Sequence, residues 1–171
     1  GIPYAAPPIG ELRFASPQPA NPWNEPLPTT EFGPRCPQIS SEMFGSIGPM
    51  DEDCLTLNIW TPTTEPKELA PVMLWIHGGG FMYDTANRPV YDGRNLARNG
   101  AVLVSFNYRL GPLGFLAHPT LTEENENHPS SGNYGIQDQQ AVLKWVKANI
   151  ASFGGDPNNI TIFGESAGAS S

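Results

Sequence analysis

The chain has 171 residues, a formal net charge of −8 and two cysteines. Its length suits one ordinary domain, and its acidic balance argues against nucleic acid as a partner, because no basic surface is available to neutralise phosphates. No apolar run approaches the roughly 18 residues of a membrane span. No Cys-x-x-Cys motif or histidine cluster indicates a metal, so we expect neither a metal nor a cofactor.

The first 37 residues are rich in proline and hold ten of the nineteen prolines of the chain. Proline lacks a backbone donor and fixes φ, which excludes this stretch from helices and central strands. We expect an extended arm that lies over a core formed by later residues. Residues 38–53 contain Gly45, Gly48 and Pro49 and predict a loop.

Four segments have the patterns of strands. Residues 55–60 alternate, which predicts a strand with one polar face. Residues 72–76 form a continuous apolar run, which favours a strand buried on both faces of a mostly parallel sheet. Residues 101–106 predict the next buried strand, and residues 160–163 the last.

Helices are predicted between these strands. Residues 93–99 suit a short helix that Gly100 closes. Residues 135–150 carry apolar side chains at steps of three and four, which predicts an amphipathic helix that ends before Gly154. Strands that alternate with helices over this length indicate an α/β sheet, and we find no internal repeat or domain linker.

The strand at 160–163 leads directly into Gly164-Glu165-Ser166-Ala167-Gly168, a G-x-S-x-G motif. A strand, a sharp turn and the start of a helix form the context in which a serine hydroxyl is exposed as an esterase nucleophile. Ser166 is therefore the predicted nucleophile. Glycine at 164 and 168 fits the strain and close packing of such a turn.

The strand at 72–76 leads into a second motif, His77-Gly78-Gly79-Gly80. This H-G-G-G form is associated with an oxyanion hole, in which backbone N–H groups stabilise the charge that develops on an ester carbonyl. The N–H of Ala167, the residue after the nucleophile, is a further predicted donor. The alternative is a tight loop without a catalytic role.

Three other titratable residues are weaker candidates. Glu165 could stabilise a cationic substrate or an imidazolium, or could be structural. His118 and His128 precede the serine, whereas in this kind of hydrolase the base follows it. We expect both to be loop residues, although a triad can occur in any chain order.

The two cysteines, Cys36 and Cys54, have two possible states. A disulfide that closes this loop would contribute about 3 kcal/mol in the chain-entropy model. The residues alone leave open whether the pair forms that bridge or two buried thiols.

Many short segments, in order, resemble the type B carboxylesterase family, which includes the cholinesterases. The matching segments are Gly1-Ile2-Pro3-Tyr4-Ala5, Leu12-Arg13-Phe14, Glu52-Asp53-Cys54-Leu55, Leu57-Asn58-Ile59-Trp60, residues 77–81, Asn107-Tyr108-Arg109, Gly114-Phe115-Leu116, Asn133-Tyr134-Gly135, Asp138-Gln139, Trp145-Val146, Asn149-Ile150, Phe153-Gly154-Gly155-Asp156-Pro157 and the G-x-S-x-G motif. The resemblance implies an α/β-hydrolase fold, a Ser-Glu/Asp-His triad and hydrolysis of a small-molecule ester through an acyl-enzyme. It also implies Gly79, Gly80 and Ala167 as the oxyanion donors.

The resemblance has structural implications too. Cys36 and Cys54 match the first disulfide of the family, which implies an oxidising compartment or secretion. The resemblance further implies two ion pairs, Arg13 with Glu52 and Arg109 with Asp138, and we expect both pairs to be buried and structural.

The chain departs from the choline-hydrolysing members at two positions. Phe44 stands where those members have a tryptophan that faces the quaternary ammonium, and phenylalanine is the weaker cation–π partner. Met82 stands where they have tyrosine. These departures favour a general carboxylesterase with an apolar acyl pocket over a choline esterase.

We expect residues 1–171 to be the N-terminal part of a single catalytic domain, truncated at both ends. The acid and the histidine would then lie beyond residue 171, and the segment alone would be inactive. A contrasting hypothesis is a non-catalytic, cholinesterase-like adhesion or binding protein. Relatives of that kind typically lose the nucleophile, whereas Ser166 is present.

Overall fold

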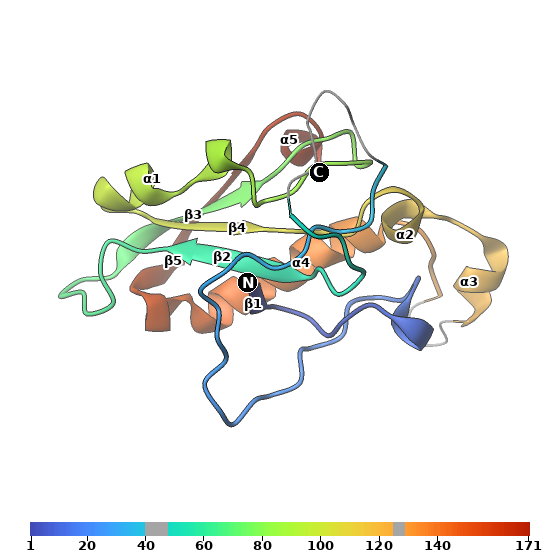
Figure 1. Ribbon diagram of the computed structural model, residues 1–171, viewed down its shortest axis with the longest axis horizontal. Helices are drawn as coiled ribbons and strands as arrows, with labels where there is room; N and C mark the ends of the chain where they lie inside the picture. Colours follow the sequence, from blue (N-terminus) through green and yellow to red (C-terminus); the bar gives the residue numbers. More distant parts are fainter. Residues whose placement is uncertain (40–47, 125–128) are drawn as a thin grey trace.

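The computed structural model describes residues 1–39, 48–124 and 129–171. The described residues form a mixed sheet in the order β1-β2-β4-β3-β5 (Figure 1). The strands are β1 (Ile2–Pro3), β2 (Thr56–Trp60), β3 (Ala70–Ile76), β4 (Val102–Phe106) and β5 (Gly155–Gly164). The strands β3, β4 and β5 are parallel, whereas β1 and β2 join antiparallel. The predicted α/β class is confirmed.

The helices include one long element. The α-helices are α1 (Arg94–Arg98), α2 (Gly111–Phe115), α3 (Pro119–Glu124), α4 (Tyr134–Asn149) and α5 (Ala167–Ser170), and the 3-10 turns are η1 (Gly10–Leu12), η2 (Pro89–Tyr91) and η3 (Ile150–Phe153). The helix α4 confirms the one predicted at 135–150, whereas α2 and α3 were not predicted. In the described parts of the chain, no helix combines the length and apolarity needed to cross a membrane.

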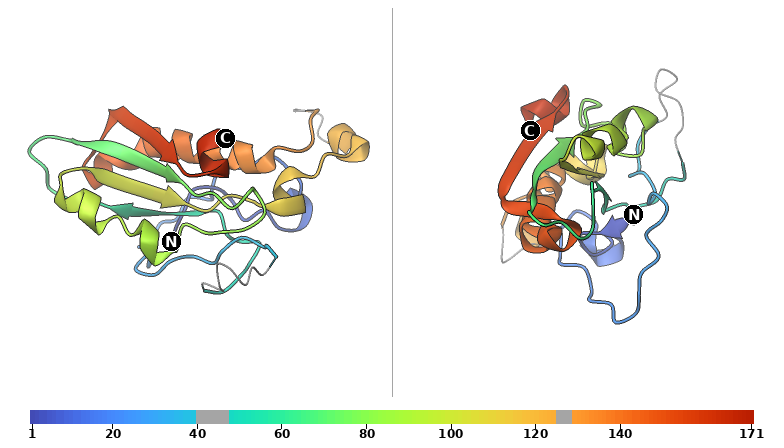
Figure 2. Two further views of the ribbon diagram at one scale, coloured as in Figure 1. Left: turned by 90° about the horizontal axis from the view of Figure 1, so that it is seen from above. Right: turned by 90° about the vertical axis from the view of Figure 1, so that its left-hand side faces the viewer.

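The sheet carries helices on both faces, with α4 on one and α1 on the other (Figure 2). On the α4 face, Val142 and Val146 are fully buried in the core together with Val72 and Leu74 of β3. This burial follows from the apolar stripe along α4, since side chains three and four apart share a helix face.

The opposite face of β3 is less covered than the sequence suggests. Burial alternates along β3, where Met73 and Trp75 remain partly accessible. The turn η2 supplies part of the cover, because the Tyr91 ring centroid lies 5.0 Å from that of Trp75. The expectation that residues 72–76 are buried on both faces is therefore wrong for these residues, although every residue of β4 is buried.

The proline-rich segment forms the expected extended arm. Apart from β1, η1 and an isolated bridge at Arg35, residues 1–37 contain no helix or strand. The arm is held to the core at Tyr4, which is buried and donates from its hydroxyl to the carbonyl of Asn107 at 2.7 Å.

Candidate active site

The two glycine motifs meet at one edge of the sheet. Ile76, the last residue of β3, pairs with Gly164, the last residue of β5. Because these strands are parallel, the loops that follow them start side by side. A Cβ atom at Gly78 would lie only 3.1 Å from the Cβ of Ser166. The fold thus brings together two motifs whose first residues, His77 and Gly164, are 87 positions apart in the chain.

Ser166 occupies a strained turn between β5 and α5. Its φ of 52° and ψ of −122° lie in a region that residues with side chains rarely adopt. The turn packs tightly, since a Cβ at Gly164 would lie 2.6 Å from the carbonyl carbon of Gly168. A Cβ at Gly168 would collide with the carbonyl oxygen of Ile76. Glycine at both positions allows this approach, and Ser166 remains exposed.

Three backbone N–H groups on the two converging loops have no protein acceptor among the described residues. Gly79 and Gly80 have φ of 91° and 59°, which turns the loop after β3 sharply. Within the described residues, the N–H groups of Gly79, Gly80 and Ala167 donate to no protein acceptor. Unused donors on the two loops that converge at a serine are the groups that an anionic oxygen requires.

His77 supports the first loop from within the core. Its ring stacks on Tyr108 at a centroid distance of 4.4 Å, and its Nδ1 lies 3.0 Å from the carbonyl oxygen of Gly78. The Tyr108 hydroxyl donates to the carbonyl of His77 at 2.9 Å. Complete burial lowers the pKa of His77 to about 4, against an opposing effect of Asp84, so the ring is neutral near pH 7.

Two of the predicted substrate residues, Glu165 and Met82, lie next to the glycine loop. The carboxylate of Glu165 lies over Gly78, where a Cβ would be 2.5 Å from Oε2. Met82 is 42% exposed just beyond the glycine loop. Phe44 lies outside the described residues.

His118 lies at the surface and makes only local hydrogen bonds among the described residues. His118 is exposed, and its Nδ1 accepts a hydrogen bond from the Thr120 N–H at 3.2 Å, while its own N–H donates to Ser131 Oγ at 3.0 Å. These local bonds suit a loop residue. His128 lies outside the described residues.

A hollow of about 710 Å³ lies elsewhere on the molecule, between the arm and α4. Its lining includes Tyr4, Trp23 and Trp145, but not Ser166. The volume is within the range of small-molecule sites, yet the hollow lacks the two converging loops. In the described part of the chain, no cluster of three or more His, Cys, Asp or Glu side chains could hold a metal.

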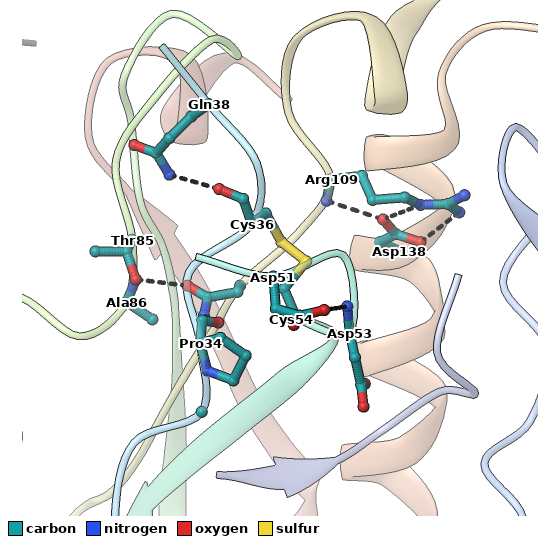
Figure 3. Close-up of a disulfide and its surroundings, with 12 residues drawn as sticks. Pro34, Cys36, Gln38, Asp51, Asp53, Cys54, Thr85, Ala86, Arg109 and Asp138 are labelled. Atoms are coloured by element: carbon teal, nitrogen blue, oxygen red, sulfur yellow. Dashed lines mark hydrogen bonds and ion pairs between the residues drawn. A yellow bond between two sulfur atoms is a disulfide. The ribbon is translucent and has the colours of Figure 1, made fainter. Parts of the chain in front are cut away.

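The structure contains the Cys36–Cys54 disulfide, and both cysteines are buried (Figure 3). The bridge links the end of the arm to the residue shortly before β2. It closes a loop of 18 positions, which limits the conformations of the unfolded chain.

The two ion pairs implied by the resemblance have different environments. Arg109 and Asp138 are buried and joined by bonds of 2.9 Å from Nε and 2.8 Å from Nη2, and the Arg109 N–H adds a third at 3.0 Å (Figure 3). Burial raises the pKa of Asp138, and the bonds from Arg109 oppose this rise. Arg13 and Glu52 also pair, but their side chains are 46% and 26% exposed. The expectation that this second pair is buried is wrong, because Arg13 follows η1 at the surface of the arm.

A polar cluster beside the glycine loop was missed by the sequence analysis. Asp84 has a φ of 94° and is 7% exposed, and Gln38, the residue directly after the arm, bonds to its backbone. Aspartate tolerates positive φ better than most residues. That tolerance is the one signal in the sequence that could have drawn attention to position 84.

Comparisons with known proteins identify the family of this chain. The Carboxylesterase family model matches residues 1–171. A fumonisin B1 esterase from Sphingopyxis macrogoltabida is 51% identical over an alignment of 173 residues that covers 99% of this chain and 32% of that protein. A cholinesterase from Mus musculus is 50% identical over an alignment of 181 residues that covers 100% of this chain and 29% of that protein.

A solved structure of a PNB esterase has a TM-score of 0.86 and 46% identity to this chain. The match covers 98% of this chain and 34% of that one. The chain therefore spans about a third of the length of the relatives it matches.

Proposed function

Because this chain belongs to the carboxylesterase family and forms part of an α/β-hydrolase fold, we propose that it is the N-terminal part of one catalytic domain of a serine carboxylesterase. The proposal rests most directly on the register that pairs Ile76 with Gly164. That register places the strained Ser166 beside the glycine loop.

In the proposed reaction, Ser166 Oγ attacks the carbonyl carbon of a carboxylic ester. Its proton passes to a histidine base, which we propose lies beyond residue 171 together with the acid that orients it. The electron pair of the carbonyl moves onto its oxygen and then returns as the alcohol leaves with that proton. Water hydrolyses the resulting acyl-enzyme by the same steps in reverse order.

The proposed oxyanion donors are the N–H groups of Gly79, Gly80 and Ala167. Their lack of protein acceptors in the described residues supports this role, since no hydrogen bond within that part of the protein must break before they bind the oxyanion. Each donor of this type typically contributes about 3–4 kcal/mol to the transition state. For Glu165 we propose an action on a cationic group of the substrate or on the imidazolium, or a structural role beside Gly78.

For the substrate, we propose neutral carboxylic esters with an apolar acyl group. The identities to the fumonisin esterase and the cholinesterase are nearly equal, so overall similarity does not select the ester. The choice follows from Phe44 and Met82, which are weak partners for a quaternary ammonium. The buried disulfide supports an oxidising compartment, and we propose that the protein is secreted.

Hydrolysis kinetics of the full-length protein test this proposal. We expect p-nitrophenyl acetate and butyrate to give a burst of one p-nitrophenol per site, and acetylthiocholine to be a poorer substrate. Ser166→Ala should abolish the burst, whereas Ser171→Ala, a change at a nearby exposed serine, should retain it. A folded protein without a burst or turnover would instead favour the non-catalytic binding protein.

A further inference from the structure

Asp84 holds an unusual position directly behind the glycine loop. It is a non-glycine residue with a φ of 94°, and it is buried. Such a backbone conformation persists only where the surrounding contacts impose it. The contacts around Asp84 therefore indicate what this part of the fold holds in place.

Asp84 and Tyr83 form the support on which Gly79 rests. A Cβ atom at Gly79 would collide with the carbonyl oxygen of Tyr83 and would lie 2.9 Å from the Cβ of Asp84. The carbonyl of Gly79 also accepts hydrogen bonds from the N–H groups of Met82 at 2.9 Å and Tyr83 at 3.2 Å. A shift of Asp84 would therefore be transmitted directly to Gly79.

Gln38 clamps the backbone of Asp84 from a segment 46 positions earlier. Its Oε1 accepts from the Asp84 N–H at 2.8 Å, and its Nε2 donates to the Asp84 carbonyl at 2.8 Å. The same Nε2 donates to the carbonyl of Cys36 at 3.0 Å (Figure 3). One amide thus binds both backbone groups of Asp84 and ties them to the disulfide.

The carboxylate of Asp84 fixes the residue from the other side. Oδ1 accepts from the N–H of Thr85 at 2.9 Å and from Nε of Arg88, and Oδ2 accepts from the hydroxyl of Tyr91 at 2.9 Å. Asn107 holds the next residues, because its Oδ1 accepts from Thr85 Oγ1 and from the Ala86 N–H, each at 2.9 Å. These bonds constrain the backbone on both sides of its strained point.

We propose that Gln38 and Asp84 are positioning residues for the oxyanion hole, which hold the N–H of Gly79 in the orientation that the transition state requires. This inference rests on the proposed function. Within the described residues, no hydrogen bond joins either side chain to Ser166, so both act through the loop backbone. A misplacement of about 1 Å in a catalytic group can lower the rate about 100-fold.

The test uses the full-length protein and three variants. Gln38→Met keeps the length of the side chain but removes all three of its hydrogen bonds. Gln38→Asn keeps the polarity but is too short to reach both groups of Asp84, and it serves if the first variant folds poorly. Gln18→Met is the control, because Gln18 is an exposed glutamine whose side-chain amide, among the described residues, bonds only to the nearby carbonyl of Ser16.

Three quantities are measured for each variant: kcat and KM for p-nitrophenyl butyrate, the inhibition constant of an aryl trifluoromethyl ketone, and the unfolding temperature. The ketone forms a tetrahedral adduct with serine and so reports on the oxyanion hole. We expect both Gln38 variants to lower kcat at least 10-fold with KM within about 2-fold. Binding of the ketone should weaken in proportion to kcat/KM.

A merely structural role would give a different result. Folded Gln38 variants that keep the kcat and ketone affinity of the wild type, whatever their unfolding temperature, would overturn the inference. Gln18→Met should match the wild type in all three quantities, and an equal loss in that variant would also contradict it. A wild-type protein that neither hydrolyses the ester nor binds the ketone would instead refute the proposed function, and this inference with it.

Discussion

Ile76 and Gly164 are paired across the parallel strands β3 and β5, and each is the last residue of its strand. The chain therefore leaves the sheet twice at the same edge, once into the glycine loop and once into the turn at Ser166. Ligand sites in open α/β sheets lie at the carboxyl ends of the strands for the same reason.

The first prediction concerns the tight packing of the serine turn. Gly168→Ala should lower the unfolding free energy by about 1–3 kcal/mol, because the added Cβ meets the carbonyl groups of Ile76 and His77. Esterase activity should fall as well, since the turn must move. Gly10→Ala is the control, with a φ of 57° but open space around its Cβ. Gly10→Ala should lower the unfolding free energy by about 1 kcal/mol and leave esterase activity unchanged.

The second prediction concerns acid stability. Burial lowers the pKa of His77 to about 4 from the usual 6.5, so the unfolded chain binds more protons between these two pH values. Its contribution to stability is therefore present above pH 6.5 and decreases as the pH falls towards 4. As the pH falls from 7 to 5, the titration of His77 should lower the unfolding free energy by about 2 kcal/mol.

His77→Phe keeps a ring that can stack on Tyr108 but removes this titration. Urea unfolding at pH 5 and pH 7 measures the effect, since the carboxylates titrate in both proteins and cancel in the comparison. The difference between the two pH values should be about 2 kcal/mol smaller in the variant. An equal difference in both proteins would show that His77 titrates normally in the fold.

The third prediction contrasts the two ion pairs. Asp138→Ala should destabilise the protein by about 3–5 kcal/mol, because it leaves Arg109 buried without its partner. Glu52→Ala should have a small effect that salt diminishes further, because its partner Arg13 is exposed to solvent. Chemical denaturation at low and high salt measures both changes. A similar loss in the two variants would contradict the contrast in burial.

The fourth prediction concerns the disulfide. Replacement of Cys36 and Cys54 by alanine should lower stability by about 3 kcal/mol, because the bridge closes a loop of 18 positions in the unfolded chain. A strong reductant should lower the unfolding temperature of the wild type. The double variant provides the control and should not respond to it; a response there would assign the effect to another cause.

The strands and the long helix were predictable, because their patterns reflect local geometry. The stripe along α4 and the apolar run of β3 each follow from the side-chain period of their element. The two motifs were likewise readable, since a strand before glycine or serine already fixes their context. The partial exposure of Met73 and Trp75 was not predictable, because it depends on which other segments cover that face.

The errors and omissions lie in contacts between distant segments. Arg13 and Glu52 were paired by resemblance, which does not state how much solvent reaches them. Gln38 and Asp84 are 46 positions apart, and their contact arises from the path of the arm and the positive φ at Asp84. Neither of these features has a periodic pattern in the sequence.

Labelling with a fluorophosphonate probe tests the central claim most directly. The full-length protein and residues 1–171 would each be compared with the corresponding Ser166→Ala variant, with the modified peptide identified by mass spectrometry. We expect the full-length protein to be modified at Ser166, the alanine variant to be unmodified, and residues 1–171 to remain unlabelled because they lack the proposed base. A folded full-length protein that is not labelled at Ser166 would contradict the account.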